Sequence, residues 1–266
     1  LNDSIHNRLR KSILQEAIQG KLVPQIPEER TAQELLEQIR QEKQKLVKEG
    51  KLKKFALSDS VIYKGDDNKY YEQVGKSDKE ITEEIAFDLP NGWSWCRLKD
   101  ICSIFTGATF KKEETVTTKE GVRILRGGNI SPFELRIKDD DIFLTKDKVK
   151  EDIILKENDI LTPAVTSLEN IGKMVRVNSD MPNTTVGGFV FIIRLYLKNQ
   201  WLSKYILYLL SSPFMIDFMK SITNKSGQAF YNIGKERLST ALLPIPSLAE
   251  QHRIVAQIEK LFEQLR

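Results

Sequence analysis

The C-terminal stretch, residues 242–266, constrains the fold more than any other part of the sequence. Pro244 and Pro246 stop a helix from crossing this point, because proline lacks a backbone N–H group and fixes φ. Ser247 and Glu250 follow with the spacing of a capping box, which predicts that a long helix begins here. The apolar positions of this helix follow a heptad a/d pattern: Leu248, Val255, Ile258, Phe262 and Leu265. This apolar face must be buried, either against its own domain or against a partner helix.

A second amphipathic helix is expected at the other end of the chain. Between residues 3 and 19, apolar side chains return every three or four positions, and Gly20 follows as a C-cap. The positions expected to pair with another helix are Ile5, Leu9 and Ile13. The two apolar stripes can cover each other, within one chain or across two.

Four segments are predicted along the chain. Residues 1–54 form a helical arm. Residues 55–88 are polar and keep no helix or strand period for long, so they are interpreted as a linker with some local order. A Pro-Asn-Gly turn then opens a larger domain, residues 89–243, and residues 244–266 form the C-terminal helix.

Composition bounds the class of protein. With 266 residues and 40% hydrophobic content, the chain can hold one or two domains with a core. No apolar run is long enough to span a bilayer and no signal region is seen, so we expect a cytoplasmic protein without membrane contact. Cys96 and Cys102, even together with His6 and His252, are too few for a structural zinc site. We expect no metal and interpret both cysteines as core residues.

Charge gives weaker guidance about partners. The formal net charge is +4, and the excess lies in residues 1–54, where twelve basic side chains oppose eight acidic ones. The lysines of residues 51–54 suit a solvated helix end, and a DNA contact is the alternative. Residues 160–240 hold nine basic and four acidic side chains, which allows a positive face there.

Beyond Gly107 the pattern is one of short strands joined by irregular loops. The expected strands are 122–126, 141–144, 159–164, 172–177 and 188–195, and the expected covering helices are 201–211 and 214–222. Strands and helices do not alternate regularly. The sequence therefore predicts an α+β fold with a curved, partly barrel-like mixed sheet.

No catalytic constellation is found in the sequence. The chain has no phosphate-cradling GxxxxGK[ST] loop, no GxGxxG after a strand, no GxSxG elbow and no HExxH. Its two histidines lie on the terminal helices, which leaves a nucleophilic triad without a base. The acidic triplet at 139–141 suits a solvated loop, and a metal site is the alternative. We therefore expect a non-catalytic chain.

Three segments have the residue types that read base edges, with glycines that allow close backbone approach. They are the loop at 107–112, the strand end at 123–129 and the polar segment at 224–232. Arg123 can instead point inward, and Tyr231 can belong to the core. With further polar loop tips, the candidate DNA-binding residues are Thr109, Lys111, Lys112, Arg123, Arg126, Asn129, Thr166, Ser167, Lys173, Thr185, Lys225, Ser226, Gln228 and Tyr231.

Five motifs give the chain a resemblance to a known family. They are LRKSILQEAIQGKLV at 9–23, LPNGWSWCRLKDICSIFTG at 89–107, GVRILRGGNI at 121–130, SGQAFYNI at 226–233 and PIPSLAEQHRIVAQIEKLF at 244–262. These motifs are distributed over nearly the whole chain, which resembles the specificity subunit of type I DNA restriction-modification systems.

The resemblance implies a role and a set of partners. Subunits of this family hold two target recognition domains apart on antiparallel helices, so the terminal helices here are expected to form a coiled-coil-like spacer. Each domain reads half of a split double-stranded DNA sequence and catalyses nothing. Modification subunits methylate adenine with S-adenosylmethionine, which is expected on those partners and not on this chain. Restriction subunits join the complex, and a homodimer through the conserved helices is an option.

The sequence departs from the family pattern because it holds one recognition domain. We interpret it as a C-terminal fragment of a longer subunit or as a half-length subunit trimmed at its start. Two other functions stay open. One is the DNA-reading tail of a single-chain methyltransferase or nuclease, and the other is a helical oligomerisation module that binds no DNA.

Overall fold

The computed structural model describes residues 2–265, and both ends of this chain belong to one unit. Unit 1 comprises the residues up to Cys102 together with those from Ser239 onward, and unit 2 is Ser103–Leu238. Unit 2 is thus shorter at both ends than the expected domain of residues 89–243. The reason is that the strands on either side of unit 2 pair with each other: β4 (Ser94–Arg97) with β17 (Leu242–Ile245), antiparallel.

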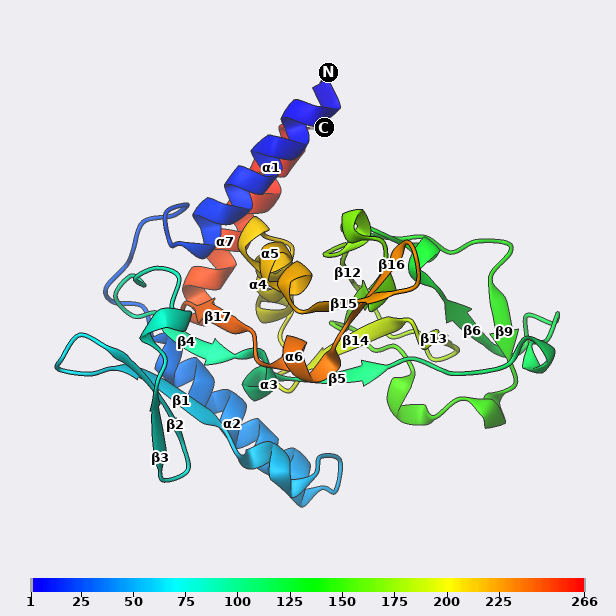
Figure 1. Cartoon of the computed structure of the whole chain (residues 1–266), viewed down its shortest axis with the longest axis horizontal. Coiled ribbons are helices and arrows are strands. Elements are labelled where there is room, and N and C mark those ends of the chain that lie inside the picture. Colours follow the sequence, from blue (N-terminus) through cyan, green and yellow to red (C-terminus); the bar gives the residue numbers. More distant parts are fainter. Residues whose placement is uncertain (1, 266) are drawn as a thin grey trace. The chain divides into compact units, whose positions relative to one another are not determined.

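Unit 1 contains three long helices: α1 (Asn2–Ile18), α2 (Ala32–Lys48) and α7 (Leu248–Glu263). In Figure 1, α1 and α7 lie side by side and run in opposite directions, so the start of α1 lies near the end of α7. Arg10 joins them, because its guanidinium donates to the Leu265 carbonyl at 3.1 Å and lies 5.8 Å from the centre of the Phe262 ring.

The burial along these two helices is uneven. Val255 and Ile258 of α7 are fully buried, and so are Leu14 and Ile18 of α1. The predicted pairing positions Ile13, Leu248, Phe262 and Leu265 are half-buried. Ile5 and Leu9, at the outer end of α1, remain 43% and 44% exposed. The apolar stripe of α1 is therefore covered only toward its C-terminal end.

The start of α7 follows its predicted signal only in part. The Ser247 hydroxyl accepts a hydrogen bond from the Glu250 N–H group at 3.2 Å, as expected for an N-cap. The Glu250 carboxylate, however, does not complete the box, because it accepts from the buried Trp93 indole at 3.0 Å. Burial raises the pKa of Glu250. Arg253 makes a bidentate ion pair with Glu29 at 3.0 and 2.7 Å, which fixes the chain between α1 and α2.

The segment interpreted as a linker contains a sheet. The strands β1 (Ser60–Lys64), β2 (Tyr70–Val74) and β3 (Ser77–Glu80) form an antiparallel meander. Its turns are marked by Asn68 and Gly75, both with positive φ. In β1 the buried position is Ser60 and the exposed ones include Val61 and Tyr63, and all of β3 is exposed and polar, so no apolar alternation marked these strands in the sequence. The pair of Asp67 and Asn68 between two tyrosine-rich runs was the available turn signal.

Unit 2 contains small sheets and two longer helices, which confirms the α+β class. Its strands are β5 (Cys102–Thr106), β6 (Val122–Leu125), β7 (Ile130–Ser131), β8 (Glu134–Leu135), β9 (Ile142–Leu144), β10 (Ile160–Pro163), β11 (Val165–Thr166), β12 (Val175–Arg176), β13 (Thr184–Val186), β14 (Val190–Leu195), β15 (Thr223–Ser226) and β16 (Phe230–Ile233). Three sheets have the orders β12-β10-β14-β5, β13-β6-β9 and β11-β16-β15, and β7 pairs with β8. The β13–β6 pair is parallel, whereas β10 pairs antiparallel with both β12 and β14.

The helices of unit 2 are α4 (Gln200–Leu210), α5 (Pro213–Ser221) and α6 (Lys235–Ser239), the last of which ends at the unit boundary; α3 (Leu98–Ile101) belongs to unit 1. Short 3-10 turns are η1 (Lys54–Leu57), η2 (Thr82–Glu84), η3 (Lys112–Glu114), η4 (Gly127–Asn129), η5 (Lys146–Lys148), η6 (Glu151–Ile153) and η7 (Leu168–Asn170). One apolar core joins β6, β10, β13 and β14. Among the helices of residues 2–265, none has the length and apolarity that a bilayer crossing requires.

Candidate nucleic-acid interface

The loops predicted to read DNA meet around the strand ends of unit 2. The Gly187 N–H group donates to the Leu125 carbonyl, and the Ala108 N–H group donates to the Val186 carbonyl, each at 2.8 Å. The Ala164 N–H group donates to the Phe189 carbonyl, also at 2.8 Å. These bonds bring together the loops at 107–112, 126–129, 164–173 and 187–189, which we call the loop cluster. Figure 1 shows the strands that carry it, β6, β13, β14 and β16.

Glycine permits the close packing of these loops. A Cβ atom on Gly107 would lie 2.2 Å from the Val186 carbonyl oxygen and 2.3 Å from that of Gly187. Any other residue would collide with backbone there. A Cβ atom on Gly188 would lie 3.1 Å from the Thr109 hydroxyl. The loop that carries Thr109 is therefore held against the 187–189 loop by backbone contact.

The third predicted segment forms a hairpin that joins the loop cluster. The strands β15 and β16 pair antiparallel, and Gly227 near the tip has a φ of 76°. On the other side of β16, Tyr231 lies opposite Thr166 of β11. Lys225, Ser226 and Gln228 are exposed, whereas Tyr231 is half-buried. The hairpin thus presents one basic and two polar side chains from a fixed base.

Three predicted contact residues are buried, Asn129, Thr166 and Thr185, and the bonds of Asn129 and Thr185 correct the prediction for these two. Asn129 donates to the Arg136 carbonyl at 2.8 Å and to the Asp141 carboxylate at 2.6 Å, and it accepts from the Arg126 N–H group at 2.8 Å. Thr185 is fully buried and donates to the Ile153 carbonyl. All their side-chain bonds are made inside unit 2, so neither can present a polar edge to a base without local unfolding.

Arg123 is half-buried, and its side chain points partly inward, which was the alternative to a DNA contact. Its guanidinium donates to the Asp141 carboxylate at 2.8 Å and lies 4.9 Å from the centre of the Phe143 ring. Burial acts to raise the pKa of Asp141, but hydrogen bonds from the Lys138 backbone, Asn129 and Arg123 outweigh it and hold this pKa below its ordinary value. The Asp141 carboxylate is thus occupied by hydrogen bonds from Arg123, Asn129 and the Lys138 N–H group, and it is not a free metal ligand.

The remaining predicted residues differ in how far they are available. Exposed side chains are those of Thr109, Lys111, Lys112 and Arg126, half-buried ones are those of Ser167 and Lys173, and Thr166 is buried. Arg126 makes one long bond, from its guanidinium to the Asp140 carbonyl at 3.4 Å. Glu114 accepts from the Lys111 N–H group at 2.7 Å, a bond that lowers the pKa of Glu114. The loop cluster therefore keeps several cationic and polar side chains open to a partner.

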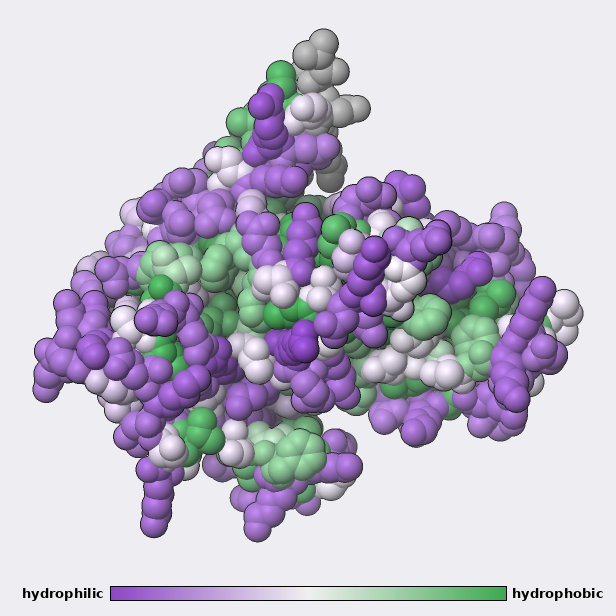
Figure 2. Space-filling model, viewed as in Figure 1, coloured by the Kyte–Doolittle hydropathy of each residue, from purple (hydrophilic) through white to green (hydrophobic). Residues whose placement is uncertain are grey.

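Three exposed apolar residues of this region were missed in the sequence. Phe189 is 72% exposed, Phe230 is 54% exposed and Leu168 is 40% exposed. Phe189 was hidden in the apolar run that continues into β14, although two glycines before it were a signal for a loop. Figure 2 shows pale and green side chains gathered, between purple margins, over the part of unit 2 where Figure 1 labels β13, β6 and β9.

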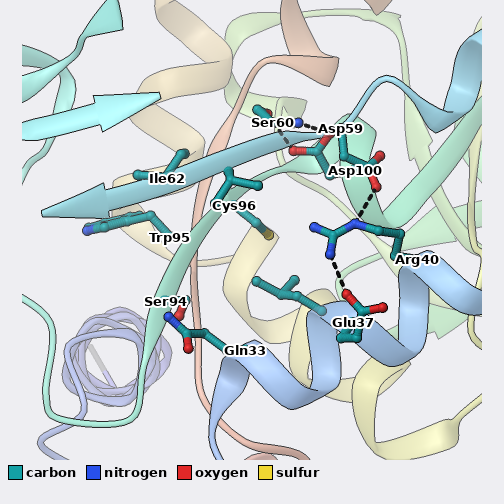
Figure 3. Close-up of a pocket in the computed structure, with 12 residues that line it drawn as sticks. Gln33, Glu37, Arg40, Asp59, Ser60, Ile62, Ser94, Trp95, Cys96 and Asp100 are labelled. Carbon is teal, nitrogen blue, oxygen red and sulfur yellow. Dashed lines mark hydrogen bonds and ion pairs between the residues drawn. The ribbon is translucent and has the colours of Figure 1, made fainter. Parts of the chain in front are cut away.

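Unit 1 contains a cavity of about 250 Å³. Charged residues that line it pair with one another, unlike the exposed cations of the loop cluster. The cavity lies between α2, β1 and β4, and Figure 3 shows Arg40 pointing from α2 to Glu37 and Asp59. The Arg40–Asp59 distance is 3.3 Å. Trp95 and Cys96 line the side formed by β4.

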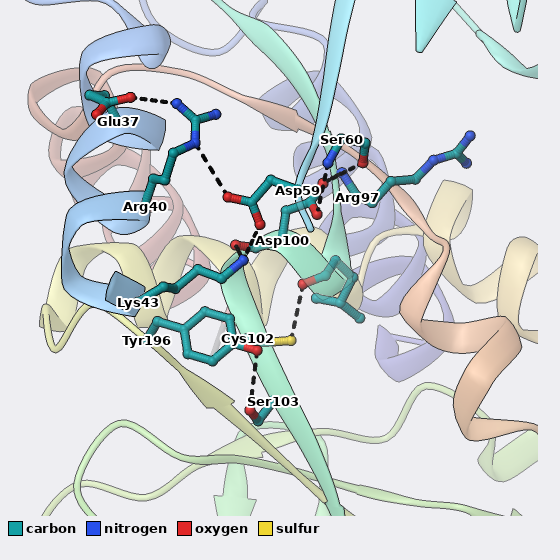
Figure 4. A network of polar contacts seen from close by, with 11 residues as sticks. Glu37, Arg40, Lys43, Asp59, Ser60, Arg97, Asp100, Cys102, Ser103 and Tyr196 are labelled. Carbon is teal, nitrogen blue, oxygen red and sulfur yellow. Dashed lines mark hydrogen bonds and ion pairs between the residues drawn. The ribbon is translucent and has the colours of Figure 1, made fainter. Parts of the chain in front are cut away.

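The charged groups beneath this cavity bind one another. The buried Lys43 ammonium pairs with Asp59 and donates to the Asp100 carbonyl at 3.4 Å (Figure 4). The Ser60 hydroxyl donates to the Asp100 carboxylate at 2.6 Å. Burial raises the pKa of Asp100, which opposes its ionisation. This network fastens α2 to β1 and α3, so we interpret it as structural.

The fold and the loop cluster together define a class of protein: an α+β scaffold that carries a recognition surface built from anchored loops. Within that class, the sequence profile of the type I restriction modification DNA specificity domain matches residues 90–266. The chain belongs to this family, which confirms the resemblance found in the sequence.

Two curated relatives match almost the whole chain. The type I restriction enzyme EcoAI specificity subunit of Escherichia coli is 32% identical over 96% of this chain and 39% of its own length. The EcoEI specificity subunit, also of Escherichia coli, is 27% identical over 96% of this chain and 40% of its own length. The chain thus spans about two fifths of the length of these relatives.

A solved structure shares the fold. A chain from work on complex assembly and conformational transition of the type I R-M system matches with a TM-score of 0.50 and 21% identity. The match covers 68% of this chain and 40% of the other.

Proposed function

We propose that this chain reads one half of a split double-stranded DNA sequence for a type I restriction-modification complex. The observation that carries the proposal is the loop cluster with the β15–β16 hairpin beside it, where exposed Arg126, Gln228 and Lys225 extend from backbone that is fixed by hydrogen bonds. Loops held on a rigid scaffold suit recognition, because their side chains need little further ordering on binding. Membership of the specificity domain family supports the same reading.

The exposed side chains divide by chemistry into two tasks. Lysine ammonium groups are point charges that neutralise phosphates, a role that suits Lys111, Lys112 and Lys225. Arginine, glutamine and threonine match the donor and acceptor patterns of base edges, a role that suits Arg126, Gln228 and Thr109. The phosphate contacts set register, and the base contacts supply sequence preference.

The partners follow from this role. Modification subunits would bind the chain, carry S-adenosylmethionine and methylate adenine, and restriction subunits would join them; the chain itself catalyses nothing. The antiparallel contact between α1 and α7 supports a coiled-coil-like spacer in the assembly, in one chain or in a homodimer. A curved sheet in unit 2 remains a prediction. A chain that reads the DNA of its host would work in the cytoplasm.

The test is a map of adenine methylation across the host genome with the gene intact and with the gene deleted. We expect a motif of two short half-sites, separated by a fixed unspecified gap, to disappear on deletion. If no motif changes, the proposal fails, and the fused-enzyme and oligomerisation alternatives gain. Binding of labelled duplex by the purified complex, measured against salt, should show the steep decline of a protein that contacts phosphates.

A further inference from the structure

The tip of the loop cluster is apolar, and its backbone is fixed. The Phe189 carbonyl accepts from the Ala164 N–H group at 2.8 Å and from the Val165 N–H group at 3.4 Å. On either side, Gly187 is bonded to Leu125 at 2.8 Å, and Val190 lies opposite Pro163 in the β10–β14 pair. These bonds leave the backbone of Phe189 little freedom, yet its side chain stays 72% exposed.

The exposure of Phe189 follows from its place directly before β14. Val190 and Phe191, the first residues of β14, are buried, and the two glycines before Phe189 end the neighbouring loop. The fixed backbone therefore directs the phenyl ring away from the core of unit 2. Isolated exposed apolar residues are ordinary on protein surfaces. An exposed ring on anchored backbone, surrounded by polar loop tips, is instead typical of a contact residue, because binding can cover it at little cost in ordering.

The neighbours of Phe189 indicate what covers the ring. The loop of Thr109 touches the residue before it, since a Cβ atom on Gly188 would lie 3.1 Å from the Thr109 hydroxyl. The loop of Arg126 is also adjacent, because a Cβ atom on Gly127 would lie 3.9 Å from the ring of Pro163, the strand partner of Val190. These neighbours are a hydroxyl and an exposed guanidinium, which match base edges in the major groove. In that groove the apolar feature of a base pair is the 5-methyl group of thymine.

We propose that Phe189 is a specificity-determining residue whose ring packs on the 5-methyl group of one thymine of the half-site. The inference rests on the proposed function and adds a chemical class of contact to it. The exposed lysines of the 107–112 loop and of the β15–β16 hairpin attract the phosphates, so the ring is brought to the base edges without an attraction of its own. The contact would distinguish a base pair by the presence of a methyl group and not by a hydrogen bond.

The test uses the complete complex with modification subunits and the half-site found by methylation mapping. Every base pair of the half-site contains one pyrimidine, so each thymine is replaced in turn by uracil and each cytosine by 5-methylcytosine. At one position we expect removal of the methyl group to weaken binding about fourfold, the effect of roughly one buried methyl group. The Phe189→Ala complex should bind the thymine and uracil duplexes equally, and Phe189→Leu should keep most of the difference.

A matched control separates this effect from loss of a surface phenylalanine as such. Phe55, in unit 1, is 76% exposed, so Phe55→Ala should leave the thymine preference unchanged. The thermal midpoint of Phe189→Ala should equal that of the parent chain, because the ring is not part of the core.

The outcomes distinguish the inference from the proposed function. If the complex shows no sequence preference for any duplex, the proposed function fails and the inference fails with it. If sequence preference is present but no methyl substitution changes binding, or if Phe189→Ala keeps the full preference, only the inference is overturned. If Phe189→Ala prevents modification subunits from binding, as measured by size-exclusion chromatography, the ring contacts protein and the inference is also overturned.

Discussion

The interior of unit 1 and the loop cluster of unit 2 use arginine in opposite ways. In unit 1, Arg97 is buried and makes a bidentate pair with Glu72 at 2.9 and 2.8 Å, a bond to Glu84 at 2.8 Å and a bond to the Thr240 carbonyl at 2.9 Å. In the loop cluster of unit 2, Arg126 is exposed, and its guanidinium makes one long bond, to the Asp140 carbonyl at 3.4 Å. The same residue type thus closes one region on itself and leaves the other open to a partner.

The comparison teaches that residue type alone does not identify a binding surface. Arg123 and Arg194 belong to unit 2, yet both are engaged, Arg123 with Asp141 and Arg194 with Asp159 at 2.8 and 2.7 Å. An arginine whose guanidinium is paired within the fold positions the scaffold, and an exposed one can read a partner. Variants of the two kinds should therefore fail in different assays.

The largest effect is expected where charge enters the apolar contact of the terminal helices. The double change Val255→Asp and Ile258→Asp places two carboxylates at fully buried positions of α7. Each unpaired buried charge opposes folding strongly, so we expect a loss of more than about 4 kcal/mol, together with loss of assembly. Thermal unfolding and size-exclusion chromatography measure the two effects. The exposed neighbour Ala256→Asp is the control, and unchanged assembly in the double variant would contradict the pairing of these helices.

A smaller but still severe effect is expected beneath the cavity of unit 1. Lys43→Met removes the buried partner of Asp59 and leaves that carboxylate without its main cation. Breaking a buried pair typically costs about 3 to 5 kcal/mol. Lys45→Met, on the same helix, removes an exposed ammonium 3.7 Å from Glu42 and should cost less than about 1 kcal/mol. Equal denaturation midpoints for the two variants would show that the buried network does not stabilise unit 1.

Removal of the exposed arginine should change preference and not stability. Arg126→Ala is expected to cost about 1 to 3 kcal/mol of discrimination at one base pair of the half-site, with an unchanged thermal midpoint. The measurement is binding of the complex to a set of duplexes with single base-pair changes. A uniform loss across all duplexes would assign Arg126 to the phosphates instead.

The hairpin lysine should show the complementary behaviour. Lys225→Ala is expected to weaken binding to all duplexes alike and to reduce the slope of log affinity against log salt by about 1. Salt titrations of the parent and variant complexes measure this slope. A changed sequence preference with an unchanged slope would reverse the assignment.

The smallest effect concerns acid stability of unit 1. The hydrogen bond from Arg97 is the largest influence on Glu72 and lowers its pKa. A lowered pKa in the folded state means that this stabilisation is complete above the ordinary glutamate pKa and is lost as pH falls through the lowered value. Glu72→Gln should therefore reduce stability at neutral pH and flatten the decline below about pH 4. Parallel curves of denaturation midpoint against pH for parent and variant would contradict this linkage.

The terminal helices and the loop segments could be predicted because their signals are local. Proline followed by a capping serine fixes where α7 begins, and glycines mark the loops that meet in the cluster. What could not be predicted depends on partners distant in sequence. Glu250 has the spacing of a capping box but binds Trp93, which only the fold brings near it.

Within the candidate site, the errors have a common physical cause. Asn129 and Thr185 are short polar residues beside glycine-rich turns, and such residues serve equally as internal hydrogen-bond bridges and as surface contacts. The local sequence looks the same for an internal bridge and for a surface contact, and only the burial of the side chain in the folded protein distinguishes the two roles. Phe189 was missed for the converse reason, because an apolar residue that continues into a buried strand reads as part of it.

The pairing of β4 with β17 has a consequence for how such a chain can change. The Leu98 N–H group donates to the Ala241 carbonyl at 2.9 Å, so the segments before and after unit 2 are joined within unit 1. Unit 2 is therefore an insertion whose entry and exit are fixed by other residues. Substitutions in its loops leave this junction and the helices intact. The side chains that these loops present can therefore vary while the scaffold that holds them stays the same.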